Sequence, residues 1–196
     1  MFNVLLDPLP EDWHGYPIDT DFQVGIMISQ CLADEELNDT EKFYKAAELL
    51  FPAAQPPVEE IQEAITWFLS DYDHDNHEGE KPSGVVIMDF DVDQWRIYAA
   101  FKQQYGIDLN KTKMHWFVFM GLLANVEECS FTRVMDIRQK KITSKMSREE
   151  KAAIKKAQKI FRIKAPEKRL SAAEQQRVND FMRYANINRG PGTAGG

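Results

Sequence analysis

Residues 114–126, MHWFVFMGLLANV, form the most apolar run of the chain. The run includes His115, Gly121 and Asn125, and no stretch of the sequence reaches the roughly 18 apolar residues of a membrane-spanning helix. A shorter apolar run of this kind is typical of a helix that is buried in a domain core. We therefore predict a compact multi-helix domain built around residues 114–126.

Segments on either side of this run also carry helical signals. Thr20 or Asp21 is expected to cap a helix that reaches about residue 33, and Asp39-Thr40 to cap one that reaches about residue 51. Apolar residues at helical spacing predict a third helix over about residues 58–70. The first of these is apolar around so much of its surface that we expect it to be mostly buried. Another helix is expected from about residues 89–93 to Tyr105, with Gly106 as its C-cap, and a short one opens at Ser130 or Thr132.

The N-terminal segment has a weaker, extended pattern. Apolar residues alternate around residues 2–6, and the stretch Trp13–Ile18 contains the turn candidate His14-Gly15. This predicts a small N-terminal β-hairpin, and residues 85–88 fit either a short strand or the approach to the next helix. The predicted fold class is thus mainly α with a minor β-hairpin.

Charge is distributed unevenly along the chain, whose net charge is −7. Residues 1–110 hold 5 Lys+Arg against 23 Asp+Glu, and residues 111–196 hold 19 against 8. Such asymmetry indicates either a polyanionic ligand for the basic end or association between chains that is guided by charge.

The basic end is predicted to be a pair of helices. Two S-x-x-E capping boxes, Ser147–Glu150 and Ser171–Glu174, predict helices over roughly residues 148–162 and 172–185. Both helices are poor in large apolar residues, so we expect them to lie at the edge of the core or to project from it. The predicted division is a helical core domain over residues 1–145, a basic helical extension over 146–187 and a flexible tail over 188–196.

The first of these helices carries a cationic stripe, the strongest candidate binding site in the sequence. Steps of 3, 4, 4 and 3 residues place five basic side chains along one face: Arg148, Lys151, Lys155, Lys159 and Arg162. This stripe fits DNA phosphates, an acidic partner helix, the acidic half of a neighbouring copy or simply a solvated lysine face. Because the whole chain is acidic and the stripe lacks aromatic or amide residues that read bases, a protein partner is favoured over nucleic acid.

Motifs for metal binding are incomplete. Residues Asp71, Asp73 and Asp75 begin a calcium-loop pattern, but Asn76 and Pro82 stand where glycine and glutamate are needed. The second run, Asp89, Asp91 and Asp93, has the same deficiency and fits a helix N-terminus. The pair His74 and His77 has no second pair of ligands to complete a zinc site, so we expect no metal or other cofactor.

Catalytic motifs are absent as well. His115 has no accompanying nucleophile motif and is expected to hydrogen-bond a carbonyl in or near the core. Cys31 and Cys129 are expected to be reduced, buried thiols. The sequence has no phosphate-binding loop and no G-x-S-x-G elbow. We therefore predict a protein that binds other proteins and is not an enzyme.

The segment Tyr105–Leu109, YGIDL, followed by Met114-His115-Trp116, resembles a family of tailed-phage proteins, the bacteriophage gene-product-fifteen family. The resemblance spans about residues 2–160. Further pieces that match are Tyr16-Pro17-Ile18, Thr20-Asp21-Phe22, Asp89-Phe90-Asp91, Tyr98 to Phe101, Phe119, Leu122 and Ile137-Arg138.

This resemblance implies a tail-assembly chaperone that works in the host bacterial cytoplasm. Such a protein coats the tape-measure protein in many copies, keeps it soluble, helps to recruit tail-tube subunits and leaves before the virion matures. The alternative is a permanent virion component, such as a head–tail connector or tail accessory protein, and a weaker third reading is a host-directed nucleic-acid binder. The oppositely charged halves also suggest that copies associate head to tail.

Overall fold

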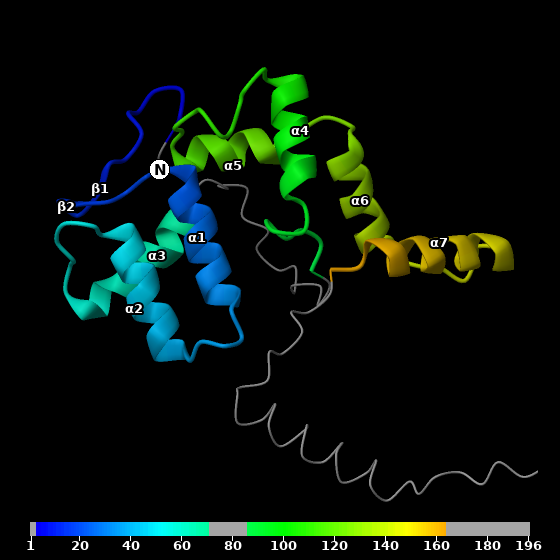
Figure 1. Ribbon diagram of the computed structural model, residues 1–196, viewed down its shortest axis with the longest axis horizontal. Helices are drawn as coiled ribbons and strands as arrows, with labels where there is room; N and C mark the ends of the chain where they lie inside the picture. The colour runs from blue at the N-terminus through cyan, green and yellow to red at the C-terminus, as the bar shows by residue number, and fades with distance from the viewer. Residues whose placement is uncertain (1–2, 71–85, 164–196) are drawn as a thin grey trace, which may run out of the picture. The chain divides into compact units, whose positions relative to one another are not determined.

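The computed structural model describes residues 3–70 and 86–163 (Figure 1). These belong to one compact unit, Met1–Ile163. The described residues form two short strands and seven helices, which confirms the predicted fold class. The elements are β1 (Asp12–Trp13), β2 (Tyr16–Pro17), α1 (Phe22–Ala33), α2 (Asp39–Leu50), α3 (Val58–Ser70), α4 (Gln94–Gln104), α5 (Trp116–Ala124), α6 (Ser130–Gln139) and α7 (Arg148–Phe161).

Several expected features lie outside the described residues. They are the acidic loop with Asp71, Asp73, Asp75, His74 and His77, the second basic helix over residues 172–185, and the tail over 188–196. The division at residues 145 and 187 therefore stays a prediction. Residues 86–88 adopt no regular structure, so in this stretch the approach to the next helix is the correct reading.

The β-hairpin forms around the predicted turn. Asp12 pairs with Pro17 and Trp13 with Tyr16, and both turn residues have positive φ, 49° at His14 and 89° at Gly15. Two successive positive φ angles are typical of the type I′ turn that matches strand twist. The described part of the alternation over residues 2–6 forms no strand, because the backbone N–H groups of Leu6 and Asp7 both bond the Asn3 carbonyl in a turn.

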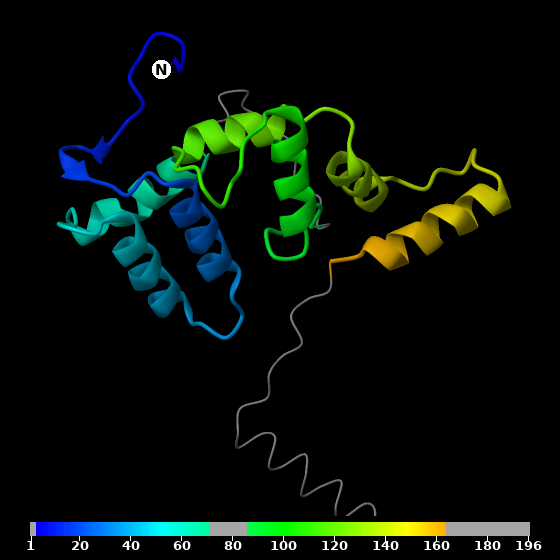
Figure 2. The same ribbon diagram turned by 45° about the horizontal axis from the view of Figure 1, so that its top comes forward.

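Helices α1, α2 and α3 pack side by side, and α5 lies against α1 (Figure 2). Of the two expected caps, Asp21 caps α1, its carboxylate accepting from the Gln23 N–H at 3.0 Å. The cap of α2 is Asn38, one residue before the predicted Asp39-Thr40, and it forms a capping box with Glu41. Only one face of α1 is buried: Met27 is 42% exposed and Leu32 38%, so the expectation that α1 is mostly buried is wrong for its outer face.

The predicted apolar helix is α5, and its aromatic residues are at the centre of the core. Trp116 is 2% exposed and Phe119 is fully buried. The ring of Phe119 stacks on Phe22 of α1 at 4.8 Å and on Phe101 of α4 at 5.1 Å. A Cβ atom on Gly25 would overlap Cε3 of Trp116. The glycine therefore lets the indole of Trp116 press directly against the α1 backbone.

His115 is the N-cap of α5 rather than a residue within the helix, which corrects its predicted place. Its Nδ1 accepts the Phe117 N–H at 3.1 Å, and its Nε2 lies 2.9 Å from the Pro10 carbonyl oxygen. In the tautomer that satisfies both contacts, Nε2–H donates to Pro10, so the expected carbonyl hydrogen bond is confirmed. Burial lowers the pKa of His115 below its ordinary 6.5, and the Pro10 hydrogen bond and the charge of Glu11 oppose this decrease only in part.

Both cysteines are free thiols. Cys31 and Cys129 are half-buried, so each is more exposed than the sequence suggested.

Candidate functional site

The cationic stripe lies on α7 as predicted. Arg148 is the first residue of α7, and Arg162 follows its last residue directly. Arg148, Lys155, Lys159 and Arg162 are exposed, whereas Lys151 is half-buried and donates from Nζ to the Ser144 carbonyl at 3.2 Å. Within the two described ranges, Lys155, Lys159 and Arg162 form no ion pair. The stripe is therefore available, and its role in binding stays a prediction.

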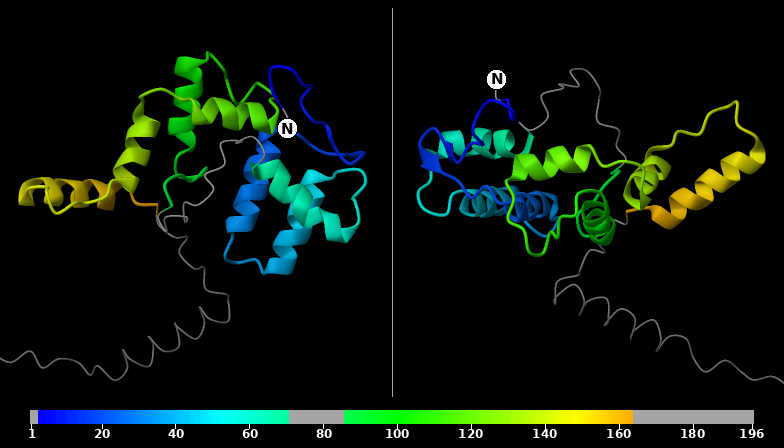
Figure 3. Two further views of the ribbon diagram at one scale, coloured as in Figure 1. Left: turned by 180° about the vertical axis from the view of Figure 1, so that it is seen from behind. Right: turned by 90° about the horizontal axis from the view of Figure 1, so that it is seen from above.

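Helix α7 is held by α6, on which its other face packs (Figure 3). Ser147 and Glu150 form the predicted capping box at its start. Ile154 and Phe161 are half-buried on the face away from the stripe. The Gln158 side-chain amide donates to the carbonyls of Ile137 at 3.1 Å and Lys140 at 2.8 Å, and so satisfies two orphan acceptors at the end of α6.

A single guanidinium, that of Arg138, connects α4, α6 and α7. It forms a buried ion pair with Asp93, with Nη1 2.5 Å from Oδ2 and Nη2 3.0 Å from Oδ1. It also donates from Nε to the Phe161 carbonyl at the end of α7, at 2.7 Å, and from Nη1 to the Ile87 carbonyl, at 2.9 Å. This network fixes the direction of α7 and hence of the stripe.

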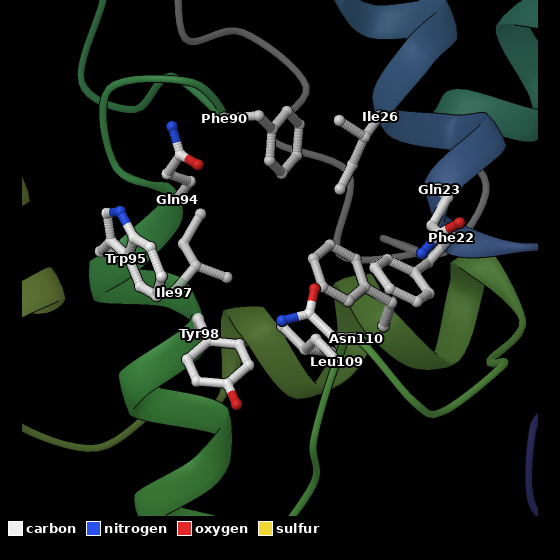
Figure 4. Close-up of a pocket in the computed structure, with 11 residues that line it drawn as sticks. Phe22, Gln23, Ile26, Phe90, Gln94, Trp95, Ile97, Tyr98, Leu109 and Asn110 are labelled. Carbon is white, nitrogen blue, oxygen red and sulfur yellow. The ribbon is translucent and has the colours of Figure 1, made fainter.

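An apolar groove of about 350 Å³ lies between α1 and α4. Figure 4 shows Phe22 and Ile26 of α1 on one side, Trp95 and Tyr98 of α4 on the other, and Phe90 between them. The remaining residues that line it are Gln23, Gln94, Ile97, Leu109, Asn110 and Phe119. Sequence analysis did not find this groove, because its residues come from four separate segments. The available signal was a tryptophan between the polar residues Gln94 and Arg96 of the predicted helix; in the structure Trp95 is 71% exposed.

Polar contacts keep the walls of the groove in place. Gln30 of α1 donates from Nε2 to Oδ1 of Asp91 at 2.6 Å and so connects α1 to the segment before α4. The Tyr98 hydroxyl lies 3.3 Å from Asp108. Partial desolvation raises the pKa of Asp108, but the Asn110 N–H, Lys102, the Tyr98 hydroxyl and Lys111 together lower it. Asp108 is therefore the hydrogen-bond acceptor of this contact at neutral pH.

The aspartates before α4 have structural roles. Asp93 pairs with Arg138 and with Arg96, at 2.9 Å, and Asp89 accepts from the N–H groups of Asp91 and Val92. Among the residues that the structure describes, no cluster of three or more His, Cys, Asp or Glu could hold a metal ion. The ring of His115 is occupied as a helix cap, with Nδ1 accepting the Phe117 N–H.

The described helices are too short or too polar to cross a membrane. Fold and surface together define a helical protein that presents an apolar groove and a separate cationic helix. The chain matches the family model described as "Bacteriophage Gp15 protein" over residues 5–163, and it belongs to that family. The match ends where the compact unit ends, at Ile163. Neither a curated protein nor a solved structure matches the chain.

Proposed function

We propose that this phage protein is a tail-assembly chaperone that binds the tape-measure protein through the apolar groove. The observation that carries the proposal is the groove itself, with exposed Trp95 on one wall and half-buried Ile26 on the other. Grooves of this kind bind the apolar face of an amphipathic helix, with specificity from a few anchoring side chains.

The chemistry of the groove suits such a client. Its floor is aromatic, so a leucine or phenylalanine side chain that enters it removes its apolar surface from water, which favours binding. Its rim carries the amides of Gln23, Gln94 and Asn110, which can bond polar groups on either side of the buried stripe. A tape-measure protein, as the family resemblance implies, is a long helix whose apolar stripes need cover before the tail tube encloses it.

In this role many copies would coat one tape-measure chain in the host bacterial cytoplasm, help to recruit tail-tube protein and leave before the virion is complete. The chain would need no catalytic group or cofactor for this task. The competing role, a permanent virion component such as a head–tail connector or tail accessory protein, requires the chain to remain in the particle.

Co-expression with the tape-measure protein of the same phage tests the proposal. We expect the tape measure to become soluble and to co-purify with many copies of this chain, as measured by affinity capture and light scattering. Mass spectrometry of purified virions is the second arm. Virions that retain the chain in stoichiometric amount, or a tape measure that stays insoluble and unbound, would contradict the chaperone role.

A further inference from the structure

A second hollow, the acidic cleft, lies where α3 passes beside the hairpin and measures about 520 Å³. It is lined by the exposed carboxylates of Glu59 and Glu63 and by the indoles of Trp13 and Trp67, whose ring centroids are 5.0 Å apart. The neighbouring Glu60 is already bonded to His14, at 3.4 Å. In residues 3–70 and 86–163, Glu59 and Glu63 take part in no ion pair.

This combination of groups suits a cationic side chain. Two exposed carboxylates without an ion-pair partner in this part of the chain attract a positive charge. Glu59 and Glu63 are four residues apart on α3, so their positions differ by one helical turn, about 6 Å of rise.

The cationic stripe matches that spacing. Lys155 and Lys159 are also four residues apart on a helix, both are exposed, and neither has an acidic partner in the described residues. Within the compact unit, α3 and α7 lie at opposite ends, as the views of Figures 1 and 3 agree. A stripe on one copy therefore meets an acidic cleft only on another copy.

We propose that α7 of one copy docks against α3 of a second copy, with Lys155 and Lys159 facing Glu59 and Glu63. Each copy then keeps a free acidic cleft at one end and a free stripe at the other, so the contact repeats into an open head-to-tail chain. This contact deepens the proposed function, because it would join neighbouring copies along the tape-measure protein. Only that role of the contact rests on the proposed function.

Sedimentation velocity of the full chain, without tape-measure protein, tests the docking. At low ionic strength we expect the weight-average sedimentation coefficient to rise with concentration, and at high salt we expect the chain to be monomeric, because the paired charges are exposed and screened. Lys155→Glu with Lys159→Glu, or Glu59→Lys with Glu63→Lys, should weaken association by about ten-fold or more. An equimolar mixture of the two double variants should associate again, since each interface then pairs opposite charges.

Matched controls carry the same change in net charge away from both surfaces. They are Lys45→Glu with Lys141→Glu, and Glu35→Lys with Glu48→Lys, all at exposed positions outside α3 and α7. These should associate like the unmodified chain, and circular dichroism should show all variants folded.

Three results would overturn the docking: an unmodified chain that stays monomeric at low salt, double variants that associate normally, or a mixture that stays monomeric. A monomeric chain whose stripe instead binds duplex DNA, with affinity that falls steeply with salt, would make the stripe a polyanion site. The sedimentation experiment contains no tape-measure protein. Its result therefore tests the docking between copies separately from the proposed chaperone role.

Discussion

Arg138 and Asp93 form a two-point salt bridge in the interior, between residues 45 positions apart in the chain. Arg138 is 6% exposed and Asp93 is fully buried. Because the same guanidinium also bonds the Phe161 carbonyl, this pair supports the packing of α4 on α6 and the docking of α7. The stripe on α7 depends on it for its orientation.

Breaking this pair from one side should be costly. Arg138→Met leaves the Asp93 carboxylate buried with only Arg96 and the Asp89 N–H as partners, and we expect the free energy of unfolding to fall by about 3–5 kcal/mol. The double variant Arg138→Met with Asp93→Asn should recover part of this loss, because it buries no unpaired charge. Urea denaturation measures the free energy of unfolding of both variants. A loss below about 1 kcal/mol for Arg138→Met would show that the salt bridge does not stabilise the fold.

Gly25 and Gly121 provide a matched pair of helix substitutions. Gly25→Ala should destabilise the fold by about 1–3 kcal/mol, because its Cβ would overlap the ring of Trp116 and outweigh the gain in helix propensity. At Gly121 no atom lies within 4 Å of an added Cβ, so Gly121→Ala should stabilise by roughly 0.5–1 kcal/mol. Thermal unfolding measures the stability of both variants. Equal changes in stability for Gly25→Ala and Gly121→Ala would contradict the close approach of α1 and Trp116.

Stability should depend on the protonation of His115. Its pKa in the folded chain is lowered by burial, so the unfolded chain binds the proton more tightly. The stability from neutral His115 is fully present above about pH 6.5 and is lost as pH falls through the lowered folded pKa.

The variant His115→Asn separates this effect from capping. Asparagine keeps an N-cap acceptor but has no titratable ring, so the fall in unfolding free energy below pH 6.5 should be shallower than in the unmodified chain. Denaturation curves recorded across this pH range measure the difference. If the unfolding free energy of the two proteins changes equally with pH, protonation of His115 is not coupled to folding.

Local features of this fold follow from the sequence, and long-range ones do not. The caps Asp21 and Ser147 and the positive φ at Gly106 mark helix ends through contacts within a few residues. Asp93 is likewise at a helix N-terminus, as its acidic run predicted, but nothing local indicates that its partner is Arg138. The same limit explains His115, whose second hydrogen bond reaches Pro10, and the apolar groove, whose walls come from α1 and α4.

The central claim, that the apolar groove binds the tape-measure protein, is tested most directly by one comparison of affinities. Trp95 is 71% exposed, so Trp95→Ala should change the unfolding free energy by no more than about 0.5 kcal/mol. Tyr44→Ala is the control, since Tyr44 is 53% exposed and lies outside the groove. In a binding titration with a soluble tape-measure fragment, we predict that Trp95→Ala weakens affinity by about ten-fold or more while Tyr44→Ala leaves it unchanged. Equal affinities for all three proteins would contradict the claim.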